Sequence, residues 1–454
     1  MEGGSITPAA ATAVGPTRWL AQRAATLRFE DLPADVVEWA RHCILDGLGV
    51  TVPGAFEPLA DIVLALVDEE GGNAQATLVA RGRRATLPQA ALFNGAASHA
   101  LDYDDVNLNM IGHPTVPVVS ALLPLAESLR LDGRRFIAAV VAGYETECRV
   151  GRAVLPDHYA RGWHSTATNG TLAAAAACAN ALGLDVDRTE MALGIACAQA
   201  AGLKSMFGSM TKPLHVGKSA ANGLLAARLA QRGFTAATAA IETSQGYADT
   251  YTRTFDADRI TAEPDRWFIR ENLFKYHAAC YLTHSAIEAA RAAVKGIDPA
   301  RIERATLRVP SGNLRVCNIL SPGTGLETKF SLRHTVALGL TGRDTAGLDS
   351  YTDDLACNPA LVRLREKVGI VADDALPLAG ARIDLVLAGG AARDATIDVG
   401  VPSRDLPDQW VRLTGKFASL VTPHLGAARA TAATDIVAAL ETRADVSALA
   451  AALA

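Results

Sequence analysis

Hydrophobic residues recur at helical spacing through the first half of the chain. Between residues 20 and about 240, apolar and small residues form one helical pattern after another, joined by short turns of Gly, Pro and Asp. Residues 170–184 (GTLAAAAACANALGL) are typical: they are rich in Ala, follow the candidate N-caps Thr168 and Asn169, and end at Gly183. This half of the sequence therefore predicts closely packed helices.

The pattern changes after about Trp267, where apolar and polar residues begin to alternate. Three segments alternate as strands do, namely residues 304–309 (RATLRV), 382–387 (RIDLVL) and 395–399 (ATIDV). Gly389 and Gly390 predict a hairpin between the last two. Helical spacing returns in residues 284–294, 334–340, 358–368 and 410–454.

These changes predict a mainly α protein with a smaller α+β domain. We expect a helical domain over residues 1–268, an α+β lid over 269–405, and a helical return over 406–454 that packs on the first domain. The length of 454 residues supports more than one domain, because a single hydrophobic core usually stops growing below that size.

Composition narrows the classes of function. Half of the residues are hydrophobic, a fifth are charged and the net charge is only -5, which describes an ordinary globular protein rather than a nucleic-acid-binding one. The N-terminal residues do not resemble a secretory signal, and no apolar run reaches the ~18 residues of a membrane span. The seven scattered cysteines form no Cys-x-x-Cys pair. We expect a cytoplasmic protein without nucleic-acid or membrane partners.

The most unusual stretch is residues 99–114 (HALDYDDVNLNMIGHP). It places the three acids Asp102, Asp104 and Asp105 near two histidines, between an Ala-rich helix and a very apolar one. Two interpretations stay open: a solvated acidic loop, or a partly covered loop whose carboxylate acts as a base. A metal site is the weaker hypothesis, because the sequence has no His-x-x-x-His, no Cys ligand pair and no calcium-binding loop.

Two further segments place cationic or imidazole side chains at predicted helix starts. In residues 162–169 (GWHSTATN), His164 precedes a helix whose free N–H groups favour an anion, although His164 could equally serve as a simple cap. Residues 211–222 (TKPLHVGKSAAN) carry Lys212 before another helix of small residues, which suits a substrate carboxylate.

The segment 274–288 (FKYHAACYLTHSAIE) lies at the predicted domain junction, a favoured position for small-molecule sites. It contributes Lys275, His277 and Cys280 as candidate substrate-binding residues. A lone cysteine in such an apolar run is more often a core residue than a nucleophile. The sequence carries neither a Gly-x-Ser-x-Gly elbow nor a dinucleotide-binding fingerprint, so we expect no cofactor.

Together these segments resemble the MmgE/PrpD family, whose activities include 2-methylcitrate dehydratase, cis-aconitate decarboxylase and iminodisuccinate epimerase. The resemblance spans nearly the whole chain and rests on the segments HALDYDD, GWHSTATNG, TKPLHVGKSAANG, KYHAACYLTHSAIEAA and GLETKFSLRHTVALGL. It implies a helical domain built from both chain ends, a homodimer, and a site in the cleft between domains. Carried over residue by residue, it implies the site residues Asp102, His113, His164 and Lys212.

The resemblance also implies proton-transfer chemistry on a small di- or tricarboxylate without a metal. In our hypothesis Lys212, Lys275 and the helix start beyond His164 hold substrate carboxylates, and Asp102 or His113 removes a proton. The acid is the other member of that pair, or else His164 or Tyr144. Dehydration of a 2-methylcitrate-like hydroxy acid is the first choice. The alternatives are an epimerase of an iminodisuccinate-like compound, a cis-aconitate-type decarboxylase, and a non-catalytic carboxylate-binding protein.

Three positions depart from the decarboxylase pattern. Val106 stands where that pattern has Thr, Cys280 where it has an active-site His, and His334 where it has an aromatic Tyr. His277 is the candidate that would occupy the space next to Cys280. These departures count against cis-aconitate decarboxylation and favour dehydration or epimerisation.

Overall fold

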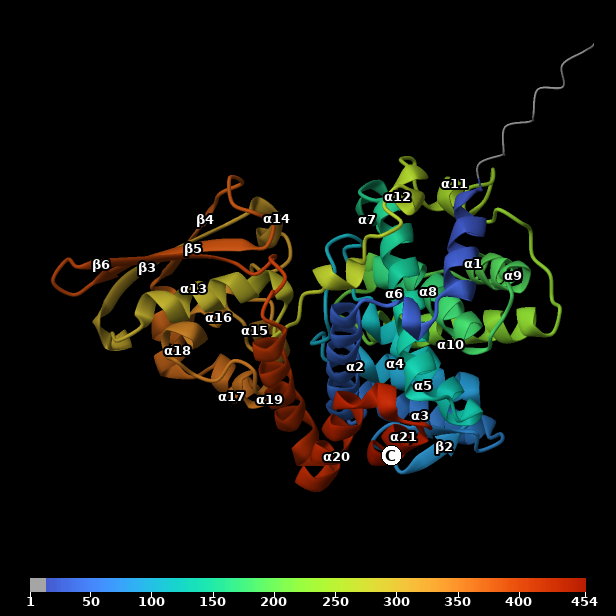
Figure 1. The fold of residues 1–454 in the computed structure, drawn as a ribbon. Coiled ribbons are helices and arrows are strands. Elements are labelled where there is room, and N and C mark those ends of the chain that lie inside the picture. The colour runs from blue at the N-terminus through green and yellow to red at the C-terminus, as the bar shows by residue number, and fades with distance from the viewer. Residues whose placement is uncertain (1–13) are drawn as a thin grey trace, which may run out of the picture.

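The computed structural model describes residues 14–454, which form a large helical domain and a smaller α+β domain (Figure 1). Both chain ends contribute to the helical domain, so the predicted fold class is confirmed. Its helices are α1 (Pro16–Thr26), α2 (Ala34–Gly54), α3 (Pro58–Glu70), α4 (Leu87–Ser98), α5 (Thr115–Leu129), α6 (Gly133–Val154), α7 (Asp157–Ala160), α8 (Ser165–Ala181), α9 (Val186–Cys197), α10 (Thr211–Gln231), α11 (Tyr247–Tyr251), α12 (Asp258–Thr261), α19 (Leu406–Leu425), α20 (Ala427–Ala438) and α21 (Ser447–Ala452).

Small residues let helix α10 pack closely against both α4 and α8. Where α4 crosses α10, a Cβ atom on Gly217 would lie 2.3 Å from the carbonyl oxygen of Leu92, so only glycine fits there. Helix α8 is buried along almost its whole length and ends at Ala181, and Gly183 follows its C-cap with a positive φ, as the predicted helix end at Gly183 requires. It begins earlier than predicted, at Ser165, so Thr168 and Asn169 lie inside the helix and do not cap it.

Helix α19, the first helix of the C-terminal segment, returns along α2. Leu413 and Phe417 join the core of the helical domain, and the ammonium group of Lys416 donates to the buried carboxylate of Asp46 at 2.6 Å. The C-terminal segment thus helps to build the same domain as the N-terminal half. The exact domain limits at residues 268 and 405 stay predictions.

The smaller domain contains a four-stranded sheet in the order β4-β3-β5-β6. Its strands are β3 (Ile302–Val309), β4 (Val368–Ala372), β5 (Gly380–Leu387) and β6 (Ala392–Asp398), and its longer helices are α13 (His284–Val294), α16 (Leu332–Leu340) and α18 (Pro359–Glu366). Strands β3 and β4 are parallel, and the other neighbours are antiparallel. The helices lie along one face of this sheet (Figure 1). Short helices α14 (Ser311–Leu314), α15 (Gly325–Thr328) and α17 (Asp353–Ala356) complete the domain.

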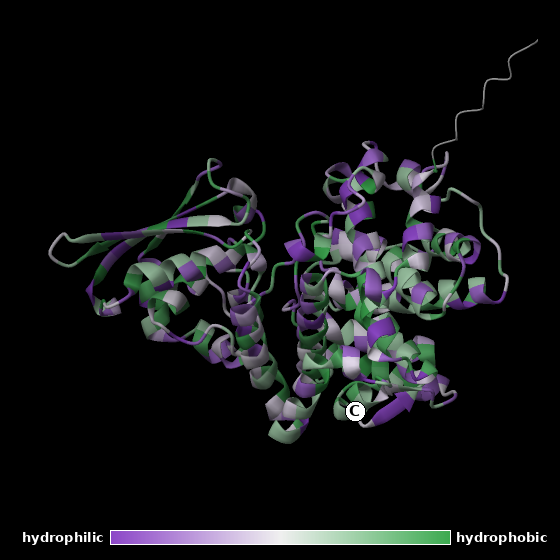
Figure 2. Cartoon of the chain, viewed as in Figure 1, coloured by the Kyte–Doolittle hydropathy of each residue, from purple (hydrophilic) through white to green (hydrophobic). Residues whose placement is uncertain are grey.

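The three predicted strands and their hairpin are confirmed, because Gly389 and Gly390 adopt positive φ angles between β5 and β6. Alternation in β5 buries every second residue against the helices. Strand β4 was not predicted: the helix expected over 358–368 ends at Glu366, and Val368 opens the strand. The short hairpin of β1 (Ala76–Leu78) and β2 (Arg83–Ala85) was also missed, and β2 is hydrophilic (Figure 2).

Among the described residues, no single helix is long and apolar enough to cross a membrane. Helices α2 and α3 pass such a test only as a pair, and they are bent by 83° relative to each other. The apolar length of α2 is accounted for by packing, since most of its residues are buried in the helical core.

Candidate active site

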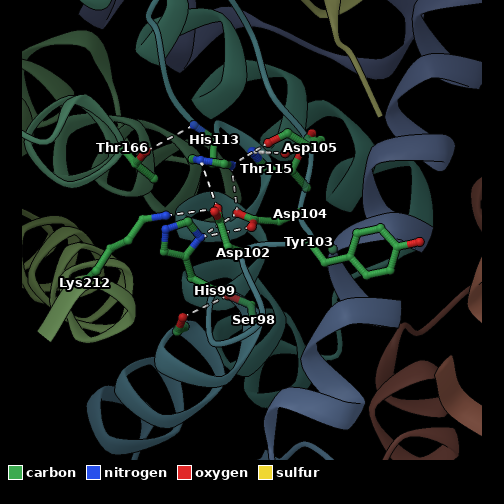
Figure 3. Close-up of polar contacts among 12 residues, drawn as sticks. Ser98, His99, Asp102, Tyr103, Asp104, Asp105, His113, Thr115, Thr166 and Lys212 are labelled. Carbon is green, nitrogen blue, oxygen red and sulfur yellow. Dashed lines mark hydrogen bonds and ion pairs between the residues drawn. The ribbon is translucent and has the colours of Figure 1, made fainter. Parts of the chain in front are cut away.

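The loop between α4 and α5 carries a carboxylate that two lysines approach. The carboxylate oxygen Oδ1 of Asp102 lies 2.9 Å from Nζ of Lys212 (Figure 3). The same oxygen lies 3.0 Å from Nζ of Lys275. The Lys275 ammonium also donates to the backbone carbonyl of Asp102. Asp102 has a φ of +52°, in the left-handed region that Asp tolerates better than most residues. The two cations thus converge on a single side chain.

Packing between distant segments produces this convergence. Lys212 stands in the first turn of α10, and the close crossing of α10 with α4 brings that turn to the loop. Lys275 comes from the extended segment after the 3-10 turn at Phe268–Glu271. That segment is tied to the loop by two backbone hydrogen bonds of 2.8 Å between Val106 and Leu273.

A second acid of the same loop holds two imidazoles. The Asp104 carboxylate accepts a hydrogen bond from Nδ1 of His99 at 2.8 Å and lies 3.3 Å from Nδ1 of His113. His113 Nδ1 also lies 2.8 Å from the carbonyl oxygen of Asp105, which can only accept. The proton of neutral His113 therefore resides on Nδ1, and the lone pair of Nε2 faces Asp102 at 3.7 Å.

Burial and charge set the protonation of these groups. Burial alone would raise the pKa of Asp102, but the charges of Lys212 and Lys275 outweigh it and hold that pKa well below its usual value. Burial lowers the pKa of Lys275, and the nearby Asp102 and Asp104 more than compensate, so its ammonium is retained. Burial lowers the pKa of His113 to about 3. The site therefore combines a carboxylate that stays ionised, ammonium groups and a neutral imidazole.

His164 lies directly before α8, on the other side of the same cluster. Its ring is stacked 5.7 Å from that of His99, and it meets Phe207 edge-on at 5.1 Å. Its Nδ1 lies 3.1 Å from Nδ1 of His215, a contact within hydrogen-bonding range. The loop is joined to the same helix start because the backbone N–H of His113 donates to Thr166 Oγ1 at 3.1 Å.

The structure brings most, but not all, of the expected site residues together. Asp102, His113, Lys212 and Lys275 are in contact, and His164 borders them. Cys280 lies close enough for the Asp102 charge to act on it; a hydrogen bond with Cys317 is the main cause that lowers the pKa of its thiol.

Two expected residues lie apart from this cluster. Tyr144 is fully buried in α6, where its hydroxyl donates to Asn272 Oδ1 at 2.8 Å and accepts from Asn107. His277 contacts Glu288 Oε1 at 2.9 Å and Thr345 Oγ1 at 2.7 Å, and lines a different hollow at the domain junction. Tyr144 and His277 therefore do not contact the Asp102 cluster in the described structure.

Several members of the cluster were not identified from the sequence. His99 and Asp104 stand inside the predicted loop, but nothing in their spacing indicated that they would bond to each other. Lys329 lies nearby, because its backbone carbonyl accepts a hydrogen bond of 3.1 Å from the Cys280 N–H, and burial lowers the pKa of its side chain. His215 follows Lys212 by three residues, and this spacing on one helix face is a signal that could have identified it.

Two of the departures from the decarboxylase pattern have clear positions. Val106 packs with Leu273 and Tyr281 in a small apolar cluster under the loop. His334 lies in α16, buried within the smaller domain, where burial and the charge of Arg365 lower its pKa to about 4. Neither residue offers a polar contact to Asp102 among the described residues.

The donor atoms of His99, Asp102, Asp104 and His113 lie within 4.8 Å of one another, as in some metal sites. Here, however, the ammonium groups of Lys212 and Lys275 already contact Asp102, at positions where a metal cation would be repelled. The cluster is thus better suited to anionic ligands. That the site uses no metal stays a prediction.

Comparison with protein families matches both parts of the chain. Residues 18–260 match the MmgE/PrpD N-terminal domain, and residues 277–442 match the MmgE/PrpD C-terminal domain. These two matches include all the residues of the site except Lys275.

Individual relatives carry the name cis-aconitate decarboxylase. The chain is 32% identical to a cis-aconitate decarboxylase-like protein of Aspergillus oryzae over 58% of each chain. It is 32% identical to a cis-aconitate decarboxylase of Aspergillus terreus over 64% of this chain and 63% of that one. With the human cis-aconitate decarboxylase the identity is 27%, over 68% of this chain and 66% of that one. The match to the fungal relatives thus spans about three fifths of their length.

Proposed function

Since this chain belongs to the MmgE/PrpD family, we propose that it is a cofactor-free lyase that removes water from a small di- or tricarboxylate resembling 2-methylcitrate. The observation that carries the proposal is the pair of ammonium groups, Lys212 and Lys275, on the single carboxylate of Asp102. Each ammonium has three N–H donors, so each can bind a substrate carboxylate while it keeps its bond to Asp102.

The cations would also lower the barrier to reaction. Removing a proton beside a carboxylate places negative charge on that carboxylate, and fixed ammonium groups stabilise this charge in a partly buried site. Lys275 suits the task because its side chain is only 1% exposed and cannot relax into solvent. Asp102 then acts mainly as the group that holds both lysines in place.

We assign the base to His113 rather than to Asp102. The pKa of Asp102 lies well below its usual value because of the two lysines, which makes this carboxylate a poor proton acceptor. His113 is neutral, its Nδ1 proton is fixed by the Asp105 carbonyl, and its Nε2 lone pair faces the same space. Binding of anionic carboxylates next to Lys275 raises the pKa of His113 toward neutrality, which improves it as a base.

The base removes the proton beside the carboxylate, the electron pair forms the new double bond, and the hydroxyl on the neighbouring carbon leaves. His164, across the cluster from His113, donates the proton that converts this hydroxyl into water. Tyr144 has no part in these steps, because its hydroxyl is committed to Asn272.

The second candidate is decarboxylation of a cis-aconitate-like acid, which the names of the relatives favour. The same lysines would bind two carboxylates while the third leaves as carbon dioxide, and His164 would protonate the resulting carbanion. Val106 and Cys280 differ from the decarboxylase pattern and therefore favour dehydration.

The test is a turnover screen of the purified protein, with a chelator present, on 2-methylcitrate, citrate, cis-aconitate and iminodisuccinate. We expect ultraviolet absorbance from a new double bond with a hydroxy acid. Release of carbon dioxide from cis-aconitate would establish the second candidate instead. Solvent deuterium in recovered substrate without a new double bond would indicate an epimerase, and tight binding without turnover a carboxylate-binding protein.

Two variants connect the activity to the site. His164→Ala should lower kcat by about 100-fold or more, since acid–base groups contribute on this scale. Asp102→Asn should lower kcat by a similar factor for a different reason, because it releases the two lysines that position the substrate. Asp68→Asn, which removes an exposed partner of Arg83, is the matched control and should keep normal turnover. Near-normal turnover of both site variants would remove these residues from the mechanism.

A further inference from the structure

His164 has an unusual environment for a proton donor. Burial, reinforced by the charges of His99 and Lys212, holds its pKa well below the usual value, so its imidazole is neutral. The charges that act most strongly on it are those of His99, Lys212, His113 and His215, and each of them disfavours a second proton on the ring. A second proton on this ring would be an extra positive charge beside Lys212. His164 therefore needs a way to give up a proton without first becoming a cation.

The contact with His215 supplies such a way. The two Nδ1 atoms lie 3.1 Å apart, so one imidazole must carry its proton on Nδ1 and the other must accept there. The Nε2 atom of each ring is not used in this contact and can exchange a proton with another group. His164 Nε2 makes no hydrogen bond to another residue within the described part of the chain.

His215 also lines a hollow at the surface. His215 is only half-buried, and it lines this hollow together with Thr211, Gln199 and Met206. The hollow has a volume of about 340 Å³, which is ample for water molecules. The pair of imidazoles thus runs from the buried cluster to a place where protons exchange with water.

We propose that His164 and His215 form a two-imidazole proton relay between the site and this hollow. The relay rests on the proposed function, in which His164 protonates the leaving hydroxyl. His164 gives its Nε2 proton to the hydroxyl and accepts at Nδ1 the proton of His215 Nδ1. His215 takes a replacement proton at Nε2 from water in the hollow. Both rings exchange one tautomer for the other, and the net change is the transfer of one proton from the hollow to the hydroxyl.

The relay makes His215 a necessary part of turnover, although it does not touch the substrate. The alternative is that His215 only orients His164. His215→Gln distinguishes the two, because a glutamine amide can hold the hydrogen bond to His164 but cannot pass a proton on. The relay predicts that His215→Gln lowers kcat by about tenfold or more with little change in KM.

A second variant allows the missing ring to be replaced. His215→Ala leaves a space that opens to the hollow, and we expect added imidazole to restore kcat in a concentration-dependent way. Met206→Leu, which changes the same hollow without a polar group, is the control and should behave as the unmodified protein does. Normal kcat in His215→Gln, or failure of imidazole to restore kcat in His215→Ala, would overturn the relay.

A spectroscopic readout keeps this test separate from the test of the proposed function. In nitrogen-15 NMR spectra of labelled protein, the relay requires one ring of the pair protonated at Nδ1 and the other at Nε2, with the signals assigned through His164→Gln and His215→Gln. Two rings that both carry their proton on Nε2 would overturn the relay even if no substrate were turned over. The relay would be established if the two rings carry opposite tautomers and if His215→Ala turns over substrate only when imidazole is added.

Discussion

Replacing Asp102 with Asn removes the carboxylate between the two lysines with little change in shape. The backbone at this position has a φ of +52°, which Asn tolerates as well as Asp does, so the substitution isolates the effect of charge from that of backbone strain. The change leaves the ammonium of Lys275, whose side chain is 1% exposed, next to Lys212 without its main counter-charge. We expect the folded protein to be destabilised.

The magnitude follows from the two ion pairs. Opposite unit charges about 3 Å apart attract by about 5 kcal/mol at an effective dielectric constant of about 20. The Asp102 side chain is 22% exposed, so solvent screens part of this attraction, and the cost of burying the charges offsets another part. A loss of about 3 kcal/mol in the free energy of unfolding is the expected net effect, within the range seen when one partner of a buried pair is removed.

Chemical denaturation followed by tryptophan fluorescence measures this loss, with Asp68→Asn as the control. The Asp68 pair with Arg83 is exposed on both sides and should contribute less than about 1 kcal/mol. Because the pKa of Asp102 is lowered in the folded state, its contribution is present above its unfolded pKa of about 3.9 and fades only as pH falls below that. The deficit of Asp102→Asn should therefore be constant between about pH 5 and pH 8. A deficit no larger than that of Asp68→Asn would refute the reasoning.

Three other predictions follow from the structure. Gly217→Ala places a methyl group 2.3 Å from the Leu92 carbonyl oxygen and should destabilise the protein by about 1–3 kcal/mol or more in the same denaturation assay. An unchanged free energy of unfolding would show that α4 and α10 can move apart at no cost. Lys416→Met leaves the buried Asp46 carboxylate without its partner, and we expect the free energy of unfolding to fall by about 3–5 kcal/mol. Burial already raises the pKa of Asp46, so the unpaired carboxyl can bind a proton at about pH 5, and the loss should be smaller there than at about pH 8. Equal losses at both pH values would contradict this. Asp104→Asn loosens the two imidazoles it holds and should lower kcat by about tenfold or more with KM nearly unchanged, as measured by steady-state kinetics; an unchanged kcat would mean that this anchoring is unimportant.

The architecture was predictable where one pattern dominated. The 3.6-residue spacing before residue 240 and the alternation in β3, β5 and β6 each reflect burial of one face, and the structure has those elements. Strand β4 was missed because its sequence, VGIVA, contains Gly and continues a helical segment without a clear break. It forms only by parallel pairing with β3, a distant partner that no local pattern reveals.

The sequence predicted several of the residues that the structure brings together, but not the contacts between them. The resemblance to a family identified Asp102, His113 and Lys212, which come from two distant segments and do meet. The roles of His99 and His215 depend on ring orientation and on the crossing of helices. These are tertiary features, and they cannot be inferred from spacing along the chain.

A crystal structure of the protein with tricarballylate tests the central claim most directly, since this tricarboxylate lacks the hydroxyl group and cannot be dehydrated. We predict that two of its carboxylates lie within hydrogen-bonding distance of Nζ of Lys212 and Nζ of Lys275, with His113 and His164 on opposite sides of the ligand. Tricarballylate bound instead in the hollow lined by His277 and Arg412, with both lysines contacting only Asp102, would contradict the account.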